Sequence, residues 1–290
     1  LGAGTRFLIA GGLLLAFLAA RRGLATVRVT RGQLGSAALI GALLPAGGNG
    51  LVTVAEKHVP SGLAALLVAS VPLWVVVYRS LARDRVAGTT LLGVGLGFAG
   101  VALLLAPGSH SGGATTAGSL LIVLAAASWA AGSFASPRIA LPSDPLVSTG
   151  WQMVFGGAVL GVAGLVAGET ADVGSAVGST DALLSLGYLI VFGSLLAFTA
   201  YVWLLQHAPI SQVATYAYVN PVIAVALGWS ILGESFGLQT LIGAAVIVGS
   251  VAIIVRREAA PRPAGEGAEA GPERADRAVR APALANREAA

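Results

Sequence analysis

The chain has 290 residues, of which 56% are hydrophobic and 10% are charged. Soluble domains carry about 25% charged residues, so this composition excludes an ordinary water-soluble domain and favours an integral membrane protein. The formal net charge is +4 at pH 7. It does not indicate nucleic-acid binding, because the arginines are dispersed in short connections between apolar runs. The absence of cysteine excludes disulfides and Cys-ligated metals.

Nine apolar runs follow one another along the chain, each close to the 20 or so residues that a transmembrane helix needs. They cover residues 3–20, 33–54, 61–80, 88–106, 117–137, 145–167, 182–206, 210–231 and 238–255. Residues 258–290 are mostly Ala, Pro, Gly, Glu and Arg, a composition that predicts a disordered tail. The sequence therefore predicts an all-α integral membrane protein with nine visible transmembrane helices.

The distribution of basic residues predicts the orientation of these helices. Arginines follow the first, third, fifth and ninth runs, at positions 21, 22, 28, 31, 79, 83, 85, 138, 256 and 257. The opposite connections contain Lys57 and several acidic residues, among them Glu169 and Glu234. Because Lys and Arg concentrate on the cytoplasmic side, we expect the odd-numbered connections and the carboxyl terminus to be cytoplasmic, and Leu1 to lie on the outer side.

An internal repeat with an offset of 149 residues connects the two halves of the chain. His58-Val59-Pro60-Ser61 matches His207-Ala208-Pro209-Ile210-Ser211, and Pro72 and Pro221 each follow twelve residues after the matching proline. The offset spans five helices, an odd number, so the two copies cross the membrane in opposite directions. Inverted repeats of this kind are typical of secondary transporters, with the substrate site between the halves. We predict a first repeat over 1–106, a second over 115–257, and the tail over 258–290.

The pairing of the repeats predicts how many helices the fold contains. Runs two, three and four pair with runs seven, eight and nine, so run one pairs with run six. Run five has no partner unless one more helix precedes Leu1. We therefore expect a ten-helix fold of five plus five, whose first helix is missing from this sequence.

Several segments resemble a known family. They are Arg6-Phe7-Leu8, Val59-Pro60-Ser61-Gly62-Leu63-Ala64-Ala65-Leu66-Leu67 leading to Pro72, Tyr216-Ala217-Tyr218-Val219-Asn220-Pro221-Val222, and Leu232-Gly233-Glu234-Ser235. In these segments the chain resembles the EamA-like, ten-helix members of the drug/metabolite transporter superfamily. The resemblance covers residues 1 to about 257 and implies inverted repeats, cytoplasmic termini, and export of amino acids, metabolites or drugs by alternating access.

Charged residues are rare within the apolar runs. Arg6, Glu56 and Lys57 lie near the ends of runs, where a long side chain can extend to the interface at little cost. No nucleophile with a base, no cluster of metal ligands and no Gly-x-Ser-x-Gly motif is found in the sequence. We therefore expect neither an enzyme nor a cofactor or metal site.

Two asparagines are candidates for contact with a substrate. Asn220 precedes Pro221 in the eighth run, and Tyr216 lies four residues earlier on the same helical face. Pro221 frees the carbonyl of Ala217, so Asn220 could instead satisfy the backbone. Asn49 follows Pro45 and two glycines, a discontinuity expected where the backbone lines a cavity or is buried in protein.

Five further residues complete the candidate substrate site: Trp129, Ser133, Trp151, Gln152 and Tyr201. Trp129 and Ser133 lie four residues apart on one helical face, and Trp151 and Gln152 lie near the start of the sixth run. Aromatic walls with a few polar groups suit an amphipathic organic substrate. Ordinary helix packing is the alternative for each of them.

Two hypotheses of different classes follow. The first is a secondary transporter of the bacterial inner membrane that exports a small metabolite, amino acid or drug-like compound. The second is a non-transporting lipid-handling or scaffold protein with the same fold. The expected partners are a small-molecule substrate and the lipid bilayer, without nucleic acid, and a homodimer is one possible assembly. A transporter should have a water-accessible cavity reached by Asn49, Gln152 and Asn220, whereas a scaffold should have a dry interior of Leu and Val.

Overall fold

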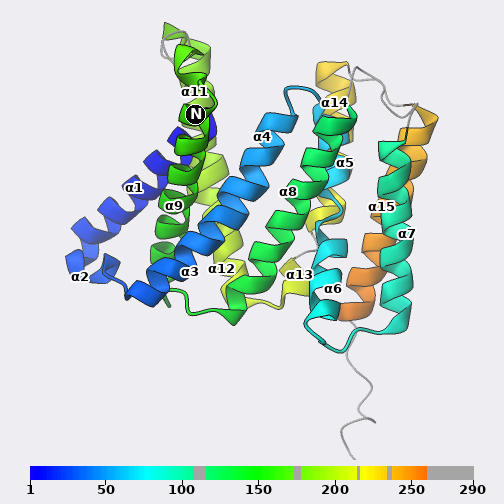
Figure 1. Ribbon diagram of the computed structural model, residues 1–290, viewed down its shortest axis with the longest axis horizontal. Helices are drawn as coiled ribbons and strands as arrows, with labels where there is room; N and C mark the ends of the chain where they lie inside the picture. Colours follow the sequence, from blue (N-terminus) through cyan, green and yellow to red (C-terminus); the bar gives the residue numbers. More distant parts are fainter. Residues whose placement is uncertain (107–114, 173–177, 214–215, 234–236, 260–290) are drawn as a thin grey trace, which may run out of the picture. The chain divides into compact units, whose positions relative to one another are not determined.

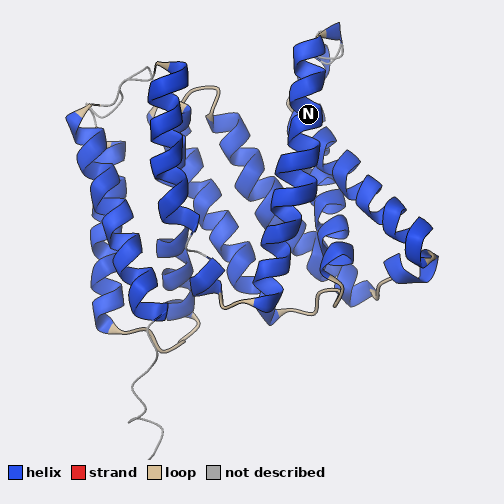
Figure 2. Cartoon of the chain, turned by 180° about the vertical axis from the view of Figure 1, so that it is seen from behind, coloured by secondary structure: helices blue, strands red, loops and turns tan. Residues whose placement is uncertain are grey.

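The computed structural model describes residues 1–106, 115–172, 178–213, 216–233 and 237–259, and these contain helices and no strand (Figures 1 and 2). Seven long apolar helices are of a length that crosses a membrane: Gly2–Arg22, Arg31–Ala55, Ser61–Leu81, Gly88–Leu105, Thr116–Arg138, Pro145–Val166 and Thr180–His207. Shorter apolar helices cover Val222–Ile231 and Leu238–Ile254. The predicted all-α membrane fold is confirmed, and the long helices begin and end within two residues of the predicted runs. The predicted tail falls almost entirely outside the described residues.

Several of the long helices consist of more than one helical segment. The first half contains α1 (Gly2–Arg22), α2 (Leu24–Val27), α3 (Arg31–Gly41), the π-helix η1 (Ala42–Gly50), α4 (Leu51–Ala55), α5 (Ser61–Val68), α6 (Val71–Leu81) and α7 (Gly88–Leu105). The second contains α8 (Thr116–Ala135), η2 (Ser136–Arg138), α9 (Pro145–Val166), η3 (Glu169–Asp172), α11 (Thr180–Tyr188), the π-helix η4 (Leu189–Phe198), α12 (Thr199–His207), α13 (Ile210–Val213), α14 (Tyr216–Leu232) and α15 (Leu238–Ala259).

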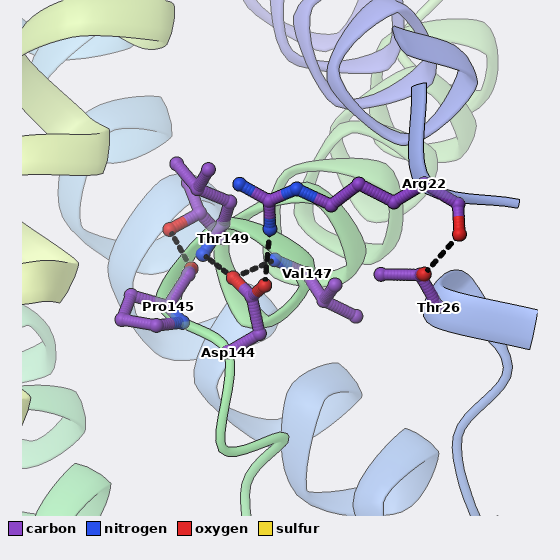
Figure 3. Close-up of polar contacts among 7 residues, drawn as sticks. Arg22, Thr26, Asp144, Pro145, Val147 and Thr149 are labelled. Carbon is purple, nitrogen blue, oxygen red and sulfur yellow. Dashed lines mark hydrogen bonds and ion pairs between the residues drawn. The ribbon is translucent and has the colours of Figure 1, made fainter. Parts of the chain in front are cut away.

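Helix α9 begins at an acidic cap that also binds a neighbouring helix (Figure 3). Asp144 Oδ1 accepts hydrogen bonds from the backbone amides of Leu146 at 2.8 Å and Val147 at 3.4 Å. Its Oδ2 forms an ion pair with Arg22 Nη1 at 2.8 Å. The carboxylate satisfies amides that have no partner within the helix, and the ion pair connects the start of α9 to the end of α1.

Glycines allow α1 and α9 to pack in close contact. A Cβ atom on Gly11 would lie 2.7 Å from the carbonyl oxygen of Gly150, and one on Gly157 would lie 2.7 Å from the backbone nitrogen of Leu8. Only glycine permits backbones to approach so closely. The end of α9 contacts the start of α1, so the two helices are antiparallel. They correspond to runs one and six of the predicted repeat, and the division of the chain into two inverted halves stays a prediction.

Two of the long helices contain a wide, π-helical middle section. These sections are η1 and η4, and they lie in runs two and seven, which the repeat pairs with each other. Pro45 lies inside η1, and the Leu43 carbonyl accepts a hydrogen bond from Ser128 Oγ of α8 at 2.9 Å. The expected discontinuity near Pro45 is therefore a widened helix rather than a break. π-Helical segments are rare in proteins, and those that occur are often found at functional sites.

The buried side chains form two large clusters. The apolar cluster contains only aliphatic buried residues, mainly from α5, α6, α7, α8 and α15: Leu63, Leu66, Leu67, Leu73, Val76, Val101, Leu104, Ile122, Ile247, Val251 and Ile254, with several smaller ones. The aromatic cluster lies among α1, α3, η1, α9, η4 and α12. Its buried members include Phe7, Ile40, Leu44, Met153, Phe198 and Val202, and Trp129 and Tyr201 pack against them.

Candidate substrate site

Three polar side chains form a hydrogen-bonded group within the aromatic cluster. The indole Nε1 of Trp129 donates to Tyr201 Oη at 2.9 Å, and Ser133 Oγ lies 2.6 Å from the same hydroxyl. Ser133 Oγ also donates to the carbonyl of Trp129 at 2.7 Å. Because Ser133 uses its proton in this bond, the Tyr201 hydroxyl is the donor to Ser133 Oγ, and each of the three groups has a partner. Buried polar groups that satisfy one another in this way fix the orientation of their side chains.

The sequence places these groups together by helical spacing and by a glycine. Trp129 and Ser133 lie four residues apart on α8 and therefore share a face. The Trp129 ring packs against η1 at Gly48, where a Cβ atom would lie 2.5 Å from Trp129 Cε3. Any side chain at this position would displace the indole from its place near Tyr201.

A continuous series of aromatic rings connects α1 to α14 through this group. The ring centroids are 6.0 Å apart for Phe7 and Phe198, 6.2 Å for Phe198 and Trp129, 5.0 Å for Trp129 and Tyr201, and 5.8 Å for Tyr201 and Tyr216. These separations are in the range of favourable aromatic pairs. Four of the eight candidate residues, Trp129, Ser133, Tyr201 and Tyr216, therefore lie in one connected site.

Asn49 lies at the other end of the ring series, beside a cation. Its Oδ1 accepts a long hydrogen bond of 3.5 Å from Arg6 Nη2, and the Arg6 guanidinium lies 4.2 Å from the centroid of the Phe7 ring. The sequence suggested that Arg6 extends to the membrane interface. In the structure its side chain contacts Asn49 of η1 and lies against the Phe7 ring.

The remaining three candidates lie apart from the ring series in the contacts of the described residues. Trp151 Nε1 donates to the carbonyl of Val27 at 3.1 Å and so connects α9 to α2. Gln152 is fully buried, and its Nε2 donates to Ser148 Oγ at 2.9 Å on the same helix. Asn220 is exposed on α14, four residues after Tyr216. No contact among the described residues joins these three to Tyr201, so their role in binding stays a prediction.

A cavity of about 590 Å³ opens at the end of the molecule where α1 begins and α9 ends. Its lining comes from α1, η1, α4, α9 and α11, and includes Thr5, Gly50, Thr53, Leu160 and Leu186. At its rim Lys57 Nζ lies 3.4 Å from Glu169 Oε1. The lining includes none of the eight candidate residues, but Thr5 and Gly50 are the chain neighbours of Arg6 and Asn49.

Two members of the site were not among the residues predicted from the sequence. Phe7 and Phe198 connect Arg6 to Trp129, and both are almost fully buried. A signal was available for each: Phe7 belongs to the Arg6-Phe7-Leu8 segment, and Phe198 lies three residues before Tyr201, which places both on one helical face. Among the described residues, no group of three His, Asp or Glu side chains could hold a metal ion.

Apolar helices of transmembrane length around a polar, aromatic interior define a polytopic membrane protein with a candidate site for a small molecule. Comparison with known proteins gives the family. The profile of the EamA-like transporter family matches residues 2–106 and 116–256. The chain belongs to the EamA-like transporter family, as the resemblance implied.

Individual relatives agree with this assignment. The chain is 41% identical over 254 residues to YedA, an uncharacterized inner membrane transporter of Escherichia coli, covering 87% of this chain and 80% of YedA. It is 29% identical to YvbV, an uncharacterized transporter of Bacillus subtilis, over 75% of this chain and 70% of the relative. A solved structure with 19% identity superposes with a TM-score of 0.58 over 89% of both chains, which shows a shared fold. The relatives indicate a transporter rather than an enzyme.

Proposed function

We propose that this protein is a secondary transporter of the bacterial inner membrane that exports a small amphipathic metabolite, amino acid or drug-like compound by alternating access. The observation that supports it most is the hydrogen-bonded group of Trp129, Ser133 and Tyr201 within a series of aromatic rings. Aromatic walls with a few oriented polar groups bind compounds that are apolar over most of their surface. The antiparallel packing of α1 on α9 supports the exchange of two related arrangements, as expected for inverted repeats.

The site that we propose for the substrate includes Trp129, Ser133, Tyr201 and Tyr216, with Asn49 and Asn220 at its two ends. An efflux screen in a host that lacks related exporters tests this function. Cells that express the protein should tolerate, and release, at least one amphipathic compound that control cells retain. Tyr201→Phe should reduce that release about tenfold, because about 1.4 kcal/mol of lost binding changes an equilibrium tenfold.

The outcome that opposes this proposal is equally specific. If no compound in the screen is released faster than from control cells, although the protein is abundant in the membrane, a lipid-handling or scaffold role replaces it. A variant at Trp203, whose side chain is exposed, serves as the control: Trp203→Phe should leave release unchanged. A reporter fused after Arg257 should read cytoplasmic and one within 168–181 external, as the arginine distribution predicts.

A further inference from the structure

Arg6 is a cation within a membrane-spanning helix, and it has no acidic partner among the described residues. It is the fifth residue of α1, and it belongs to none of the ion pairs found among the described residues. Its Nε is buried and has no hydrogen-bond partner there. Ionisable side chains inside membrane spans are costly, and they mark functional sites unless they are paired. Packing alone does not compensate the free-energy cost of placing this cation inside a membrane span.

The guanidinium lies between the two π-helical segments. On one side, Nη2 is 3.5 Å from Asn49 Oδ1 of η1, a distance at the limit of a hydrogen bond. On the other side, a Cβ atom added to Gly193 of η4 would lie 4.0 Å from Arg6 Nη1. The centroid of the Phe7 ring lies 4.2 Å from Arg6 Cζ, so the ring and the guanidinium form a cation–π contact. These contacts hold the guanidinium in place and use one of its five donors.

A cavity of about 590 Å³ lies beside this position. Its lining includes Thr5 and Gly50, the residues next to Arg6 and Asn49 in the chain, whereas Arg6 and Asn49 themselves are not in the lining. Lys57 and Glu169 also line the cavity, and they form an ion pair with each other. The charge of Lys57 is therefore already paired, and Arg6 is the cation near this cavity without an ion pair among the described residues.

We propose that Arg6 and Asn49 bind a carboxylate group of the transported compound, and that the series of rings from Phe7 to Tyr216 binds its apolar body. The guanidinium offers two parallel N–H donors that match the two oxygens of a carboxylate. The Asn49 amide adds a donor, because its oxygen already faces Arg6. The inference rests on the proposed function and specifies its substrate class as organic acids with an apolar or aromatic body.

Binding of matched acids and amides to the purified full chain in detergent tests the proposal. The probes are phenylacetate against phenylacetamide and hexanoate against hexanamide, and the readout is the ligand-dependent shift in thermal unfolding. We expect at least one acid to stabilise the wild-type protein, with an apparent Kd at least tenfold lower than that of its amide. Arg6→Gln should weaken binding of that acid at least tenfold and leave the weak binding of the amide unchanged.

Two further variants keep the test decisive. Arg6→Lys retains the charge but not the paired donors, and we expect intermediate affinity for the acid. Arg22→Gln removes a cation from the opposite end of the same helix and should bind both acids like the wild type. If Arg6→Gln does not fold, the comparison of acid and amide binding to the wild type and to Arg6→Lys still tests the proposal. Equal binding of acid and amide, no shift with either acid, or an undiminished shift in a folded Arg6→Gln overturns the proposal.

The outcome separates this inference from the proposed function. Release of neutral compounds but not acids from cells supports transport and overturns the carboxylate site. Binding of an acid that depends on Arg6, together with no release of any compound, supports the carboxylate site and opposes transport.

Discussion

The apolar cluster and the aromatic cluster both lie between apolar helices but have very different chemistry. In the apolar cluster, buried aliphatic side chains such as Leu104 and Ile247 fill the space between helices. In the aromatic cluster, the hydroxyl of Tyr201, the indole of Trp129 and the hydroxyl of Ser133 satisfy one another. The helices around the aromatic cluster also include both π-helical segments. On this comparison we propose that the apolar cluster mainly stabilises the molecule and the aromatic cluster binds the substrate.

This contrast predicts the largest loss of stability in the apolar cluster. Leu104 is fully buried, and Leu104→Ala should lower the free energy of unfolding by about 2–4 kcal/mol, because it removes packed methyl groups and leaves a cavity. Release of substrate per molecule of membrane-inserted protein should remain close to that of the wild type. Denaturant titration in micelles measures the first quantity and efflux normalised to abundance the second. A Leu104→Ala protein of normal stability that fails to transport would contradict the division into two roles.

A smaller loss of stability, with a larger loss of transport, is expected for Gly48→Ala. The new Cβ atom would lie 2.5 Å from Trp129 Cε3, so the indole must move away from Tyr201 at a cost of about 1–3 kcal/mol. Gly35→Ala is the matched control on the same transmembrane helix, since a Cβ atom there meets nothing within 4 Å. The measurements are efflux and the fluorescence of Trp129 in a variant that lacks the other tryptophans. Normal transport by Gly48→Ala would show that the position of Trp129 is not important for binding.

Asn220→Ala should change transport and leave stability nearly unchanged. The side chain is exposed on α14, so truncation removes no buried contact, and exposed substitutions usually change stability by less than about 0.5 kcal/mol. If Asn220 contacts substrate, release per molecule should fall severalfold, and Tyr216→Phe should lower it less. Membrane abundance and efflux are compared on the same cells. Normal release by both variants would remove this face of α14 from the site and shift attention to Asn49.

The smallest effect is expected at the cap of α9, outside both clusters. Asp144→Ala removes two hydrogen bonds to backbone amides together with the ion pair to Arg22, and should destabilise the protein by about 1–2 kcal/mol. Arg22→Gln removes only the ion pair, in which the side chains are 51% and 32% exposed, and should cost about 0–1 kcal/mol. The loss in Arg22→Gln should shrink at high salt, whereas the loss in Asp144→Ala should shrink only in part, because its cap hydrogen bonds do not depend on salt. A larger loss for Arg22→Gln than for Asp144→Ala would contradict this assignment.

Run length and composition were sufficient to predict the membrane-spanning helices, and the segments that resemble the EamA-like family were sufficient to predict the family. Hydrophobic runs determine where helices span, since every backbone polar group in a bilayer must be satisfied within the helix. The runs at 88–106 and 145–167 therefore match α7 and α9 almost residue for residue. Helical spacing also indicated that Trp129 and Ser133 share a face, and the structure joins this pair to Tyr201. The same spacing paired Tyr216 with Asn220, but only Tyr216 reaches the ring series among the described contacts.

The tertiary structure alone decided which polar groups meet and which way they point. Arg6 lies near a helix end, and the sequence is compatible both with extension to the interface and with a contact to Asn49. The choice depends on helices that are distant in the chain, namely η1 and η4, and on glycines that let them approach. Gln152 shows the converse. Its polar side chain in an apolar run suggested a site residue, but in the structure it donates a hydrogen bond to Ser148 on its own helix. Periodicity determines the face of one helix, whereas the partner of that face is set by packing between helices.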